Sequence, residues 1–492
     1  MPRLTDLIRS ADAGIGITGA TDITIEHITS DSRQVKPGSL FVAIHGGNVN
    51  GLDYLPQAIK HGAAAVLCEH GDIPDAGGLT VLRAAEPRHA LARLAAALYG
   101  EQPAHIVAVT GTDGKTSTAD FSRQLMHQLG FSSASLGTIG ITLGNGSLLQ
   151  DASHTTPDPV ELHRILAEMA GDGCTHLAME ASSHGLHQYR LDGVRLEAAA
   201  FTMLGRDHMD YHKDEADYFN AKARLFSELL PEGKTAVLNA DDKVYTLLET
   251  ICRQRGMHII DYGTQAHEFR IKEILPHGNG QQVSCVMSGT PYLLDIPLAG
   301  AFQVMNILAA VGLAVGQGSK LEHVLTFLAN LKGVPGRLER VVTLSNGAAV
   351  YIDYAHTPMA LANILNSLRP HTHNALHVVF GCGGNRDKGK RPQMGKAAIE
   401  LADHVIVTDD NPRNEDAGQI RKEVLAGAHG AQEVGDRRQA IRKALKALQS
   451  GDVLVIAGKG HEKTQTIGSE LIPFHDGQVA KELAHEMELV DA

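Results

Sequence analysis

The feature that most constrains the fold is an alternation of short apolar segments with amphipathic helical segments, which begins near residue 103. The apolar segments have the length of buried strands and lie at 106–110, 176–179, 198–202, 236–238, 349–352, 376–380, 404–408 and 453–457. Strands that alternate with helices form parallel sheets whose faces the helices cover. The sequence therefore predicts an α/β protein in which polar motifs after the strands meet at the carboxyl edge of a sheet.

Length and loop composition divide the chain into blocks. Its 492 residues suggest about three domains. A break is expected at Gln102-Pro103, and a Gly/Pro cluster at 333–336 has the composition of a linker. We therefore expect domains at 1–102, 103–334 and 335–492.

Composition narrows the function classes. The net charge of −12 argues against a sequence-independent nucleic-acid binder, because such a protein needs a basic surface. The five cysteines show no CxxC spacing, as in reduced cytoplasmic proteins. Gln303 and Asn306 interrupt the most apolar window, 299–318, so we expect a buried helix there and no membrane insertion. We expect a cytoplasmic monomer that binds small molecules.

The segment TGTDGKTSTAD follows the first strand of the second block. Gly111 and Gly114 permit a tight turn, and Lys115 and Thr116 open the next helix. Backbone N–H groups at a helix N-terminus bind phosphate, a lysine neutralises it, and a threonine hydroxyl ligates Mg²⁺. Val109 stands where the full phosphate-loop pattern has glycine, so this is a shortened variant. The competing interpretation is a glycine-rich turn that only caps a helix.

Further polar residues follow the neighbouring strands of this block. Glu180 stands at a strand tip, where phosphate-loop proteins place an acid beside the metal; a solvated glutamate is the alternative. His208 is a candidate metal ligand, although lone histidines are more often structural. Lys222 lies in an amphipathic helix, and the pattern alone indicates a surface lysine whose stem packs along the protein.

Several loops carry polar side chains that could contact a ligand. The paired hydroxyls of Thr155 and Thr156 suit an anionic or amide ligand, and an ordinary helix N-cap explains them equally well. In the first block, Ser30 and Ser32 could bind a nucleotide-like or phosphate group. Further possible contacts after Glu180 are Ser182, Gln188 and Arg190.

Strands of the third block deliver polar residues at their carboxyl ends. DYAHTP follows 349–352, GCGGNRDKGKRP follows 376–380, TDDNPR closes 404–408, and GKGHE follows 453–457. A pocket that holds both carboxylates and guanidinium groups suits a zwitterion, whose two ends carry opposite charges. We therefore expect one amino-acid pocket here, and chance surface charge is the alternative.

The motifs occur in a fixed order: TGTDGKTST, MEASSHGL, RDHMDYH, FNAKARLF, GAFQVMN, VPGRLE, DYAHTP, GCGGNRDKGKRP, TDDNPR and GKGHE. With this ordered set the chain resembles the Mur ligases over nearly its whole length, and most narrowly those that add meso-2,6-diaminopimelate. The resemblance implies an N-terminal domain for the UDP end of the substrate, a central P-loop-type ATPase domain with a parallel-rich sheet, and a C-terminal Rossmann-like domain.

The resemblance also implies a reaction that uses ATP and Mg²⁺. ATP phosphorylates the D-Glu γ-carboxylate of UDP-N-acetylmuramoyl-L-alanyl-D-glutamate, the amine of diaminopimelate attacks the acyl phosphate, and phosphate leaves. The first step is needed because a carboxylate is a poor electrophile; Mg²⁺ and Lys115 offset the charge on the moving phosphoryl group. The matching lysine of the family at Lys222 is carbamylated, which turns a cation into an anionic metal ligand.

Residue roles follow from the same resemblance. The ATP contacts are Gly111, Thr112, Asp113, Gly114, Lys115, Thr116, Ser117, Asn306, Arg337, Asp353 and His356. The metal ligands are Thr116, Glu180, His208 and carbamylated Lys222, and the catalytic set is Lys115, Glu180, His208 and Lys222. The UDP-muramoyl-dipeptide contacts are Ser30, Ser32, Gly47, Asn48, Val49, His154, Thr155, Thr156, Ser182, Gln188 and Arg190, with His154 standing where the family often has Asn. The diaminopimelate contacts are Arg386, Asp410, Asn411, Pro412, Arg413, Gly458 and Glu462.

Three alternatives stay open. A sister ligase that adds L-lysine faces an uncharged end where diaminopimelate carries a second carboxylate, and Arg413 supplies a cation for that carboxylate. A folylpolyglutamate synthetase-like ligase shares the phosphate loop but should lack DNPR. A non-catalytic phosphate-loop protein does not need Lys222, the pair Asp353 and His356, and a separate zwitterion pocket together.

Overall fold

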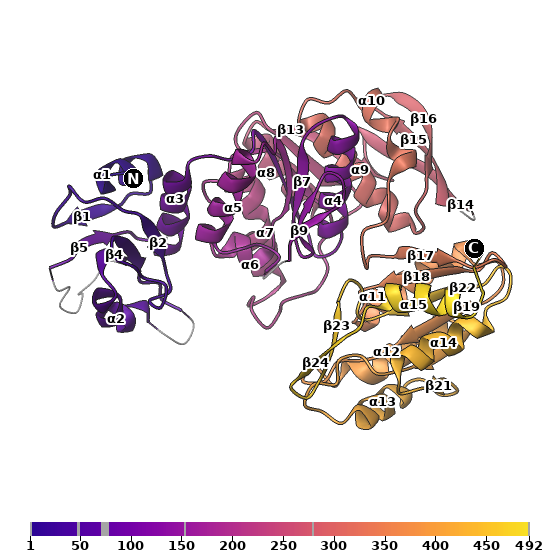
Figure 1. Cartoon of the computed structure of the whole chain (residues 1–492). Helices are drawn as coiled ribbons and strands as arrows, with labels where there is room; N and C mark the ends of the chain where they lie inside the picture. Colours follow the sequence, from indigo (N-terminus) through magenta and orange to yellow (C-terminus); the bar gives the residue numbers. More distant parts are fainter. Residues whose placement is uncertain (1, 47–49, 70–77, 152–153, 278–279, 491–492) are drawn as a thin grey trace. The chain divides into compact units, whose positions relative to one another are not determined.

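The computed structural model describes residues 2–46, 50–69, 78–151, 154–277 and 280–490 (Figure 1). The predicted substrate contacts Gly47, Asn48 and Val49 lie outside these ranges. The chain divides into two compact units: unit 1 is Met1–Arg270 with Asn306–Thr326, and unit 2 is Ile271–Met305 with Phe327–Ala492. The finer division at residues 102 and 334 stays a prediction.

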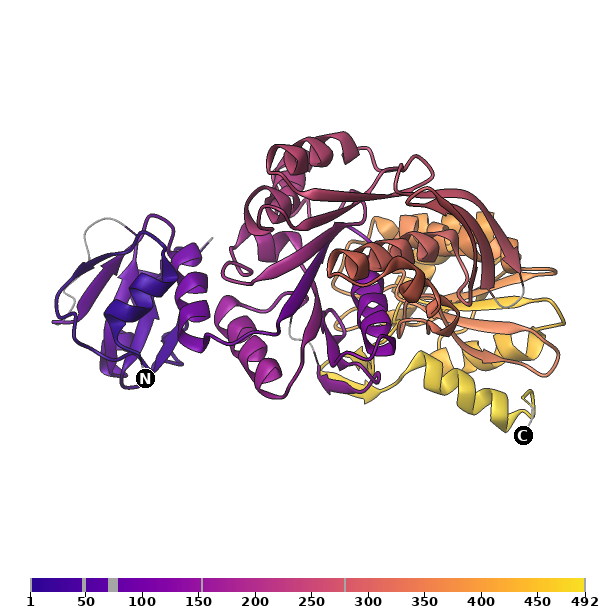
Figure 2. The same ribbon diagram turned by 90° about the horizontal axis from the view of Figure 1, so that it is seen from above.

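Unit 1 begins with a five-stranded sheet (indigo in Figures 1 and 2). The strand order is β1 (Gly16–Thr18), β5 (Thr80–Arg83), β4 (Ala63–Cys68), β3 (Ser39–Val42) and β2 (His27–Thr29). The helices are α1 (Leu4–Ala11), the short turn η1 (Gly51–Tyr54), α2 (Leu55–Lys60) and α3 (Pro87–Tyr99). Leu40 packs in a cluster with residues of α1 and α3, whereas Phe41 packs in a second cluster with residues of α2. Neighbouring side chains thus face opposite sides, as in a strand covered on both faces.

The rest of unit 1 is built on a larger mixed sheet. Its strands include, in spatial order, β14 (Phe269–His277), β13 (His258–Gly263), β12 (Thr235–Asn239), β11 (Leu196–Phe201), β6 (His105–Thr110), β10 (His176–Glu180), β7 (Ser133–Gly137), β8 (Gly140–Leu143) and β9 (Leu148–Gln150). The helical segments are α4 (Lys115–Gln128), α5 (Pro159–Gly171), α6 (Ser183–His187), α7 (Glu215–Arg224), η2 (Leu225–Leu229), α8 (Tyr245–Gln254), α9 (Ala301–Gly316) and α10 (Leu321–Leu325).

Strand β6 is the centre of this sheet and pairs in parallel with both β10 and β11. Glu180 lies opposite Val109, and Phe201 lies opposite Thr110. The two neighbours of β6 are β10 and β11, and both come later in the sequence. The chain after β6 therefore adds strands on both sides of it. This is the switch point at which α/β sheets bind ligands.

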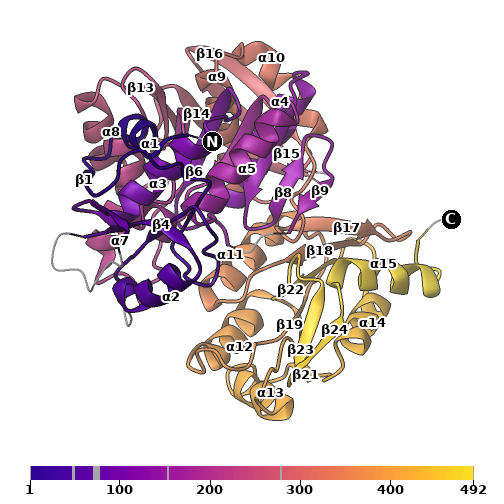
Figure 3. The same cartoon turned by 60° about the vertical axis from the view of Figure 1, so that its left-hand side comes forward.

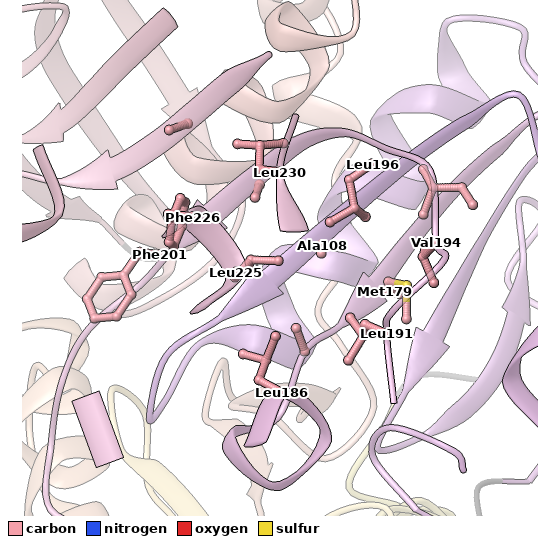
Figure 4. Packing of buried hydrophobic residues seen from close by; sticks show 14 of the residues in the cluster. Ala108, Met179, Leu186, Leu191, Val194, Leu196, Phe201, Leu225, Phe226 and Leu230 are labelled. Atoms are coloured by element: carbon pink, nitrogen blue, oxygen red, sulfur yellow. The ribbon is translucent and has the colours of Figure 1, made fainter. Parts of the chain in front are cut away.

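An aliphatic and aromatic core holds the helices on this sheet. Figure 4 shows Met179 and Phe201 of the sheet in the same cluster as Leu186, Leu225 and Phe226 of the helical segments. All five side chains are fully buried. Burial of each such side chain contributes about 1.5–3 kcal/mol relative to exposure, which suffices to hold a chain without Trp.

Unit 2 contains a second α/β sheet. The strand order is β17 (Glu339–Thr343), β18 (Ala349–Asp353), β22 (Val453–Ala457), β19 (Leu376–Phe380), β20 (His404–Val407) and β21 (Gln432–Glu433). The helical segments are η3 (Leu328–Asn330), α11 (Pro358–Leu368), η4 (Arg369–His371), α12 (Lys390–Leu401), α13 (Ala417–Leu425), α14 (Arg437–Ala447) and α15 (Asp476–Glu486). Antiparallel hairpins are formed by β15 (Gly280–Met287) with β16 (Thr290–Ile296), and by β23 (Thr464–Ile467) with β24 (Glu470–Pro473).

The helices of unit 2 cover both faces of its sheet (Figure 3). Val378 of β19 packs in one cluster with residues of α11, α12 and α13. The next residue, Val379, packs in another cluster with residues of α14 and α15. Both β19 and β22 are buried on both faces. β22 is apolar throughout and β19 is apolar except for His377, whose Nε2 lies 3.1 Å from Asp452 Oδ2, which is why the sequence shows them as largely apolar runs.

The predicted strands are confirmed, with ends that differ by one or two residues. The four third-block strands that carry polar motifs are neighbours in the order β18, β22, β19 and β20, as the shared pocket requires. The apolar window forms α9, where Val304, Ile307 and Leu308 are fully buried. Across the described ranges, no helix is both long and apolar enough to cross a membrane.

A buried ion pair ties two strand ends to α15. Arg437 and Asp476 are both 0% exposed, and the guanidinium donates through Nε and Nη2 to the two carboxylate oxygens, each at 2.7 Å. Nη2 also donates to Ala457 O (3.0 Å), and Nη1 donates to Asp409 O (3.3 Å). Because Ala457 ends β22 and Asp409 follows β20, this pair fixes the chain just before two of the predicted pocket motifs.

Replacing Asp476 by Ala should leave the Arg437 guanidinium buried and unpaired. We expect a loss of about 3–5 kcal/mol of unfolding free energy, together with faster hydrogen exchange of the β20 and β22 amides. Urea unfolding of the intact chain, combined with exchange measurements, tests this. Glu482→Ala is the matched control, because it breaks the exposed pair with the next residue, Arg438, and should barely change the urea midpoint. Equal effects of the two substitutions would contradict the role of the buried pair.

Candidate functional site

The phosphate-loop segment joins β6 to α4, with Gly114 as the N-cap at φ 88°. A Cβ on Gly111 would lie 1.8 Å from Thr202 Oγ1, and one on Gly114 would lie 2.4 Å from Asn306 Oδ1. Both positions therefore need glycine. The strand, tight turn and helix N-terminus that phosphate binding requires are present.

Two lysines converge on the carbonyl oxygen of Gly111. Lys115 Nζ donates to Gly111 O at 2.9 Å and to Thr112 O at 2.8 Å. Lys222 Nζ donates to the same Gly111 oxygen at 2.7 Å, although it comes from α7, more than a hundred residues away. The Lys115 ammonium thus places positive charge beside the loop, which suits a polyanionic ligand such as a phosphate chain.

The surface-lysine interpretation of Lys222 is wrong, because the residue is only 1% exposed. Its ammonium lies 4.4 Å from the centre of the Tyr218 ring. Burial, reinforced by the charge of Lys115, lowers the pKa of Lys222 well below its usual value. The sequence contained a signal for this burial, since Lys222 is four residues from both Tyr218 and Phe226, and both of these are buried.

Glu180 is buried at the carboxyl end of β10, so the solvated-glutamate alternative is wrong. Thr138 donates to its carboxylate twice, from the backbone N to Oε1 at 2.7 Å and from Oγ1 to Oε2 at 3.2 Å. Gly137 allows this approach, because a Cβ there would lie 2.1 Å from Oε1. Thr138 carries no motif and was not predicted from the sequence.

The predicted dipeptide contacts near Glu180 form one hydrogen-bond network. Thr156 Oγ1 donates to Glu180 O (2.9 Å) and accepts from Ser182 N (3.1 Å). Arg190 Nη1 donates to Thr156 O (2.7 Å), and its Nη2 donates to Gln188 Oε1 (2.8 Å).

Thr155 and Thr156 do not cap the following helix. The N-cap of α5 is Asp158, whose Oδ1 accepts from Val160 N and Glu161 N, so the cap interpretation of the threonines is wrong. Thr155 Oγ1 instead lies 3.1 Å from Thr138 Oγ1, which places it beside Glu180. His154 is exposed.

The two serines predicted in the first block differ in environment. Ser30 is exposed, whereas Ser32 is buried and its Oγ donates to Gln57 Oε1 at 2.9 Å. The structure does not join either serine to the Glu180 network by a described hydrogen bond.

His208 is half-exposed, with its backbone in the left-handed region at φ 55°. Its ring meets that of His184 edge-on at 4.7 Å. Among the described residues, no group of three or more His, Cys, Asp or Glu side chains could hold a metal ion. Thr116 and Glu180 nonetheless carry hard oxygen donors, the type that Mg²⁺ prefers. Glu180 ends β10, and Thr116 lies in the first turn of α4, which follows the adjacent strand β6. A lysine ammonium has no lone pair and cannot be a metal ligand, so Lys222 must lose its proton, or be carbamylated, before it could bind a metal.

In unit 2, Asp353 ends β18 and organises the turn after it. Its Oδ1 accepts from Ala355 N and its Oδ2 accepts from Leu338 N, both at 2.7 Å. His356 Nδ1 donates to Tyr354 O at 2.8 Å, so this nitrogen carries the proton. Tyr354 in turn packs under the Arg337 guanidinium at 5.0 Å. The structure therefore brings the three unit 2 candidates Arg337, Asp353 and His356 together around Tyr354.

The loop after β19 and the loop after β20 are in close backbone contact. A Cβ on Gly384 would lie 1.9 Å from Pro412 O, and one on Gly383 would lie 2.8 Å from Arg413 Nη1. Arg413 Nη1 donates to Gly384 O at 2.8 Å. The glycines of GCGG are thus required by the DNPR segment. Arg386 is exposed in the same loop.

The loop after β22 completes this cluster. A Cβ on Gly458 would lie 2.7 Å from Asp410 Oδ2. Asn411 Nδ2 donates to Glu462 Oε2 at 2.8 Å. Lys459, which the sequence reasoning passed over, donates to both side chains, to Asn411 Oδ1 at 3.2 Å and to Glu462 Oε2 at 3.0 Å. The predicted residues of three loops are therefore brought together, and their binding of an amino acid stays a prediction.

A cavity of about 870 Å³ lies elsewhere in unit 1. Its lining includes Asp192, Arg224, Glu197 and Lys234, and none of the predicted site residues. Its main charges are already paired, Arg224 with Asp192 at 2.6 Å and Lys234 with Glu197 at 2.8 Å. This cavity therefore does not coincide with the predicted site residues.

Three family models match successive stretches of the chain. The model described as Mur ligase family, catalytic domain, matches residues 24–99, the Mur ligase middle domain matches 109–314, and the Mur ligase, glutamate ligase domain, matches 336–460. A protein of Rhizobium meliloti (strain 1021) is 49% identical over 93% of both chains, and one of Bradyrhizobium diazoefficiens is 47% identical over 98% of this chain and 99% of its own. Both are named UDP-N-acetylmuramoyl-L-alanyl-D-glutamate–2,6-diaminopimelate ligase.

The chain is also similar to solved structures of ligases. A structure of a UDP-N-acetylmuramoyl-L-alanyl-D-glutamate–2,6-diaminopimelate ligase is similar with a TM-score of 0.72 and 33% identity, over 94% of this chain and 95% of that chain. A folylpolyglutamate synthase of Mycobacterium tuberculosis shares the fold at a TM-score of 0.59, with 20% identity and 73% of this chain covered. With relatives at nearly half identity along almost all of its length, the chain belongs to the Mur ligase family.

Proposed function

We propose that this protein joins meso-2,6-diaminopimelate to the D-glutamate γ-carboxyl of UDP-N-acetylmuramoyl-L-alanyl-D-glutamate, with ATP as the energy source. The observation that carries the proposal is the combination, in one chain, of a phosphate loop beside two lysines with a pocket of opposite charges. The names of relatives at 47–49% identity support the same reaction.

The proposed reaction begins with activation of the carboxylate. Its oxygen attacks the γ-phosphorus of ATP, ADP leaves, and an acyl phosphate forms. The attacking amine of diaminopimelate then adds to the acyl carbon, and the tetrahedral intermediate collapses with loss of phosphate and a proton. Lys115 stabilises the negative charge on the phosphoryl group as it moves. Mg²⁺, when bound, offsets further negative charge on the phosphates.

The proposed metal ligands are Thr116, Glu180, His208 and carbamylated Lys222. A carbamate forms when a neutral amine adds to CO₂ and releases a proton, so it needs an unprotonated lysine. Burial beside Lys115 favours the neutral amine, as the lowered pKa of Lys222 indicates. The carbamate replaces a buried cation by an anion that can bind metal.

The remaining roles of the proposal follow the motifs. The nucleotide contacts are Gly111, Thr112, Asp113, Gly114, Lys115, Thr116, Ser117, Asn306, Arg337, Asp353 and His356. The UDP-muramoyl-dipeptide contacts are Ser30, Ser32, Gly47, Asn48, Val49, His154, Thr155, Thr156, Ser182, Gln188 and Arg190. The diaminopimelate contacts are Arg386, Asp410, Asn411, Pro412, Arg413, Gly458 and Glu462. We further propose a cytoplasmic monomer whose domains divide at residues 102 and 334.

The central test measures ADP release with the UDP-muramoyl-dipeptide as acceptor. We expect turnover with meso-diaminopimelate and strongly reduced turnover with L-lysine, because L-lysine leaves Arg413 without its carboxylate partner. Mass spectrometry should find the UDP-muramoyl-tripeptide. A preference for L-lysine would identify the sister ligase, and the absence of ADP release with either amino acid would overturn the proposal.

Arg413→Ala should weaken recognition of diaminopimelate selectively. The loss of one hydrogen-bonded charge pair, about 1.5–3 kcal/mol, corresponds to a KM for diaminopimelate raised about tenfold to hundredfold. The KM for ATP should not change. Lys388→Ala is the matched control, because it removes a cation of the neighbouring loop whose described salt bridge is to Glu415. An unchanged KM for diaminopimelate in the Arg413 variant would exclude Arg413 from substrate binding.

Lys222→Ala and Lys222→Arg should both nearly abolish turnover, because neither side chain forms the proposed carbamate. Short carboxylic acids should restore part of the activity of the Ala variant by supplying an anionic ligand. In the wild type, ¹³C-labelled bicarbonate should give a carbamate signal by NMR. Lys243→Ala, at an exposed lysine, is the control. Full activity of Lys222→Ala would remove the residue from the catalytic set.

A further inference from the structure

Lys459 is a buried cation that touches two proposed substrate contacts. The residue is 0% exposed, which is rare for lysine unless its charge is paired. Its ammonium donates to Asn411 Oδ1 at 3.2 Å, to Glu462 Oε2 at 3.0 Å and to Thr464 O at 2.7 Å. These three acceptors match the three N–H donors of the group. They come from three chain segments: the DNPR loop, the loop after β22, and β23.

The contacts of Lys459 fix the orientation of the Asn411 amide. Asn411 Oδ1 accepts from Lys459 Nζ and from Thr466 N (2.9 Å), while Asn411 Nδ2 donates to Glu462 Oε2 (2.8 Å). The two ends of an amide are similar in shape, and a flip exchanges the donors for the acceptor. Here a flip would place the NH₂ group against two donors. The second N–H of Asn411 has no partner in the described part of the chain, so a donor is available at this point.

The two carboxylate oxygens of Glu462 differ in their contacts, in part because of Lys459. Oε2 receives hydrogen bonds from both Lys459 and Asn411. In the described contacts, Oε1 receives none, and the side chain is 32% exposed. One carboxylate oxygen is therefore held in place, and the other can accept from a cation. A fixed amide donor beside an open carboxylate oxygen matches the carboxylate and ammonium groups of an amino acid.

We infer that Lys459 is a positioning residue: it sets the hydrogen-bond polarity of the amino-acid pocket through Asn411 and Glu462, without touching the substrate. This inference rests on the proposed function, because it needs diaminopimelate to bind at these residues. A purely structural Lys459 would hold β23 to the loops and neutralise Glu462, with no specific effect on amino-acid recognition.

Steady-state kinetics of Lys459→Met test the inference. Methionine has a similar length but no donors, so Asn411 Oδ1 keeps only the Thr466 N–H and Glu462 Oε2 keeps only the Asn411 amide, which loosens both side chains. We expect the KM for meso-diaminopimelate to rise about tenfold to hundredfold, with unchanged KM values for ATP and the UDP-muramoyl-dipeptide. Lys443→Met, at an exposed lysine of α14, should have no effect. An unchanged KM for diaminopimelate, or an equal rise in all three KM values, overturns the inference.

A double-substitution cycle separates positioning from stability. If Lys459 acts through Asn411, Lys459→Met should add little to the KM effect of Asn411→Ala, whereas independent effects would add. Additive effects overturn the inference.

Should Lys459→Met not fold, Lys459→Arg decides the question. Arginine keeps the buried charge, but its planar fork cannot give the same three bonds. The KM for diaminopimelate should still rise, and a wild-type value overturns the inference. Failure of the wild type to use diaminopimelate would instead refute the proposed function, so the two failures are distinguishable.

Discussion

The parallel pairing of β6 with both β10 and β11 is the constraint on which unit 1 depends. It places the end of β6, Glu180 and the segment after Phe201 at one edge of the sheet, although long stretches of chain separate them. The close packing at this edge explains its glycines, since Gly111 faces Thr202 and Gly137 faces Glu180 too closely for any Cβ. The polar residues could not meet there if the strand order were different.

Each unit buries a lysine beside polar groups, but the neighbours of the two lysines differ. In unit 1, burial and the nearby charge of Lys115 lower the pKa of Lys222 and favour loss of its proton. In unit 2, the Lys459 ammonium donates to a carboxylate oxygen, an amide oxygen and a backbone carbonyl oxygen. The two buried lysines thus differ in their neighbours and not in their burial.

The sequence was sufficient for the strands, the phosphate loop and the loops of unit 2, because apolar runs and glycine-rich motifs are local signals. It misjudged Lys222 from helical periodicity, although the spacing to Tyr218 and Phe226 indicated a buried face. It could not identify Thr138 or Arg437, because their roles depend on contacts with residues far along the chain. Two acidic residues flank DNPR, and their contacts depend on the fold. Asp409 pairs with Arg421, and Asp416 caps α13.

Arg413 adopts φ 53°, a conformation that glycine favours, and hydrogen bonds to the β23–β24 hairpin hold it there. Its N–H donates to Thr466 O at 3.0 Å, and its carbonyl accepts from Gly468 N at 2.8 Å. The hairpin therefore holds the backbone of Arg413, from which the guanidinium extends. On the proposed function, a change in the length or turn of this hairpin would shift Arg413 and so alter the selectivity for the amino acid, while the other proposed contacts stay the same.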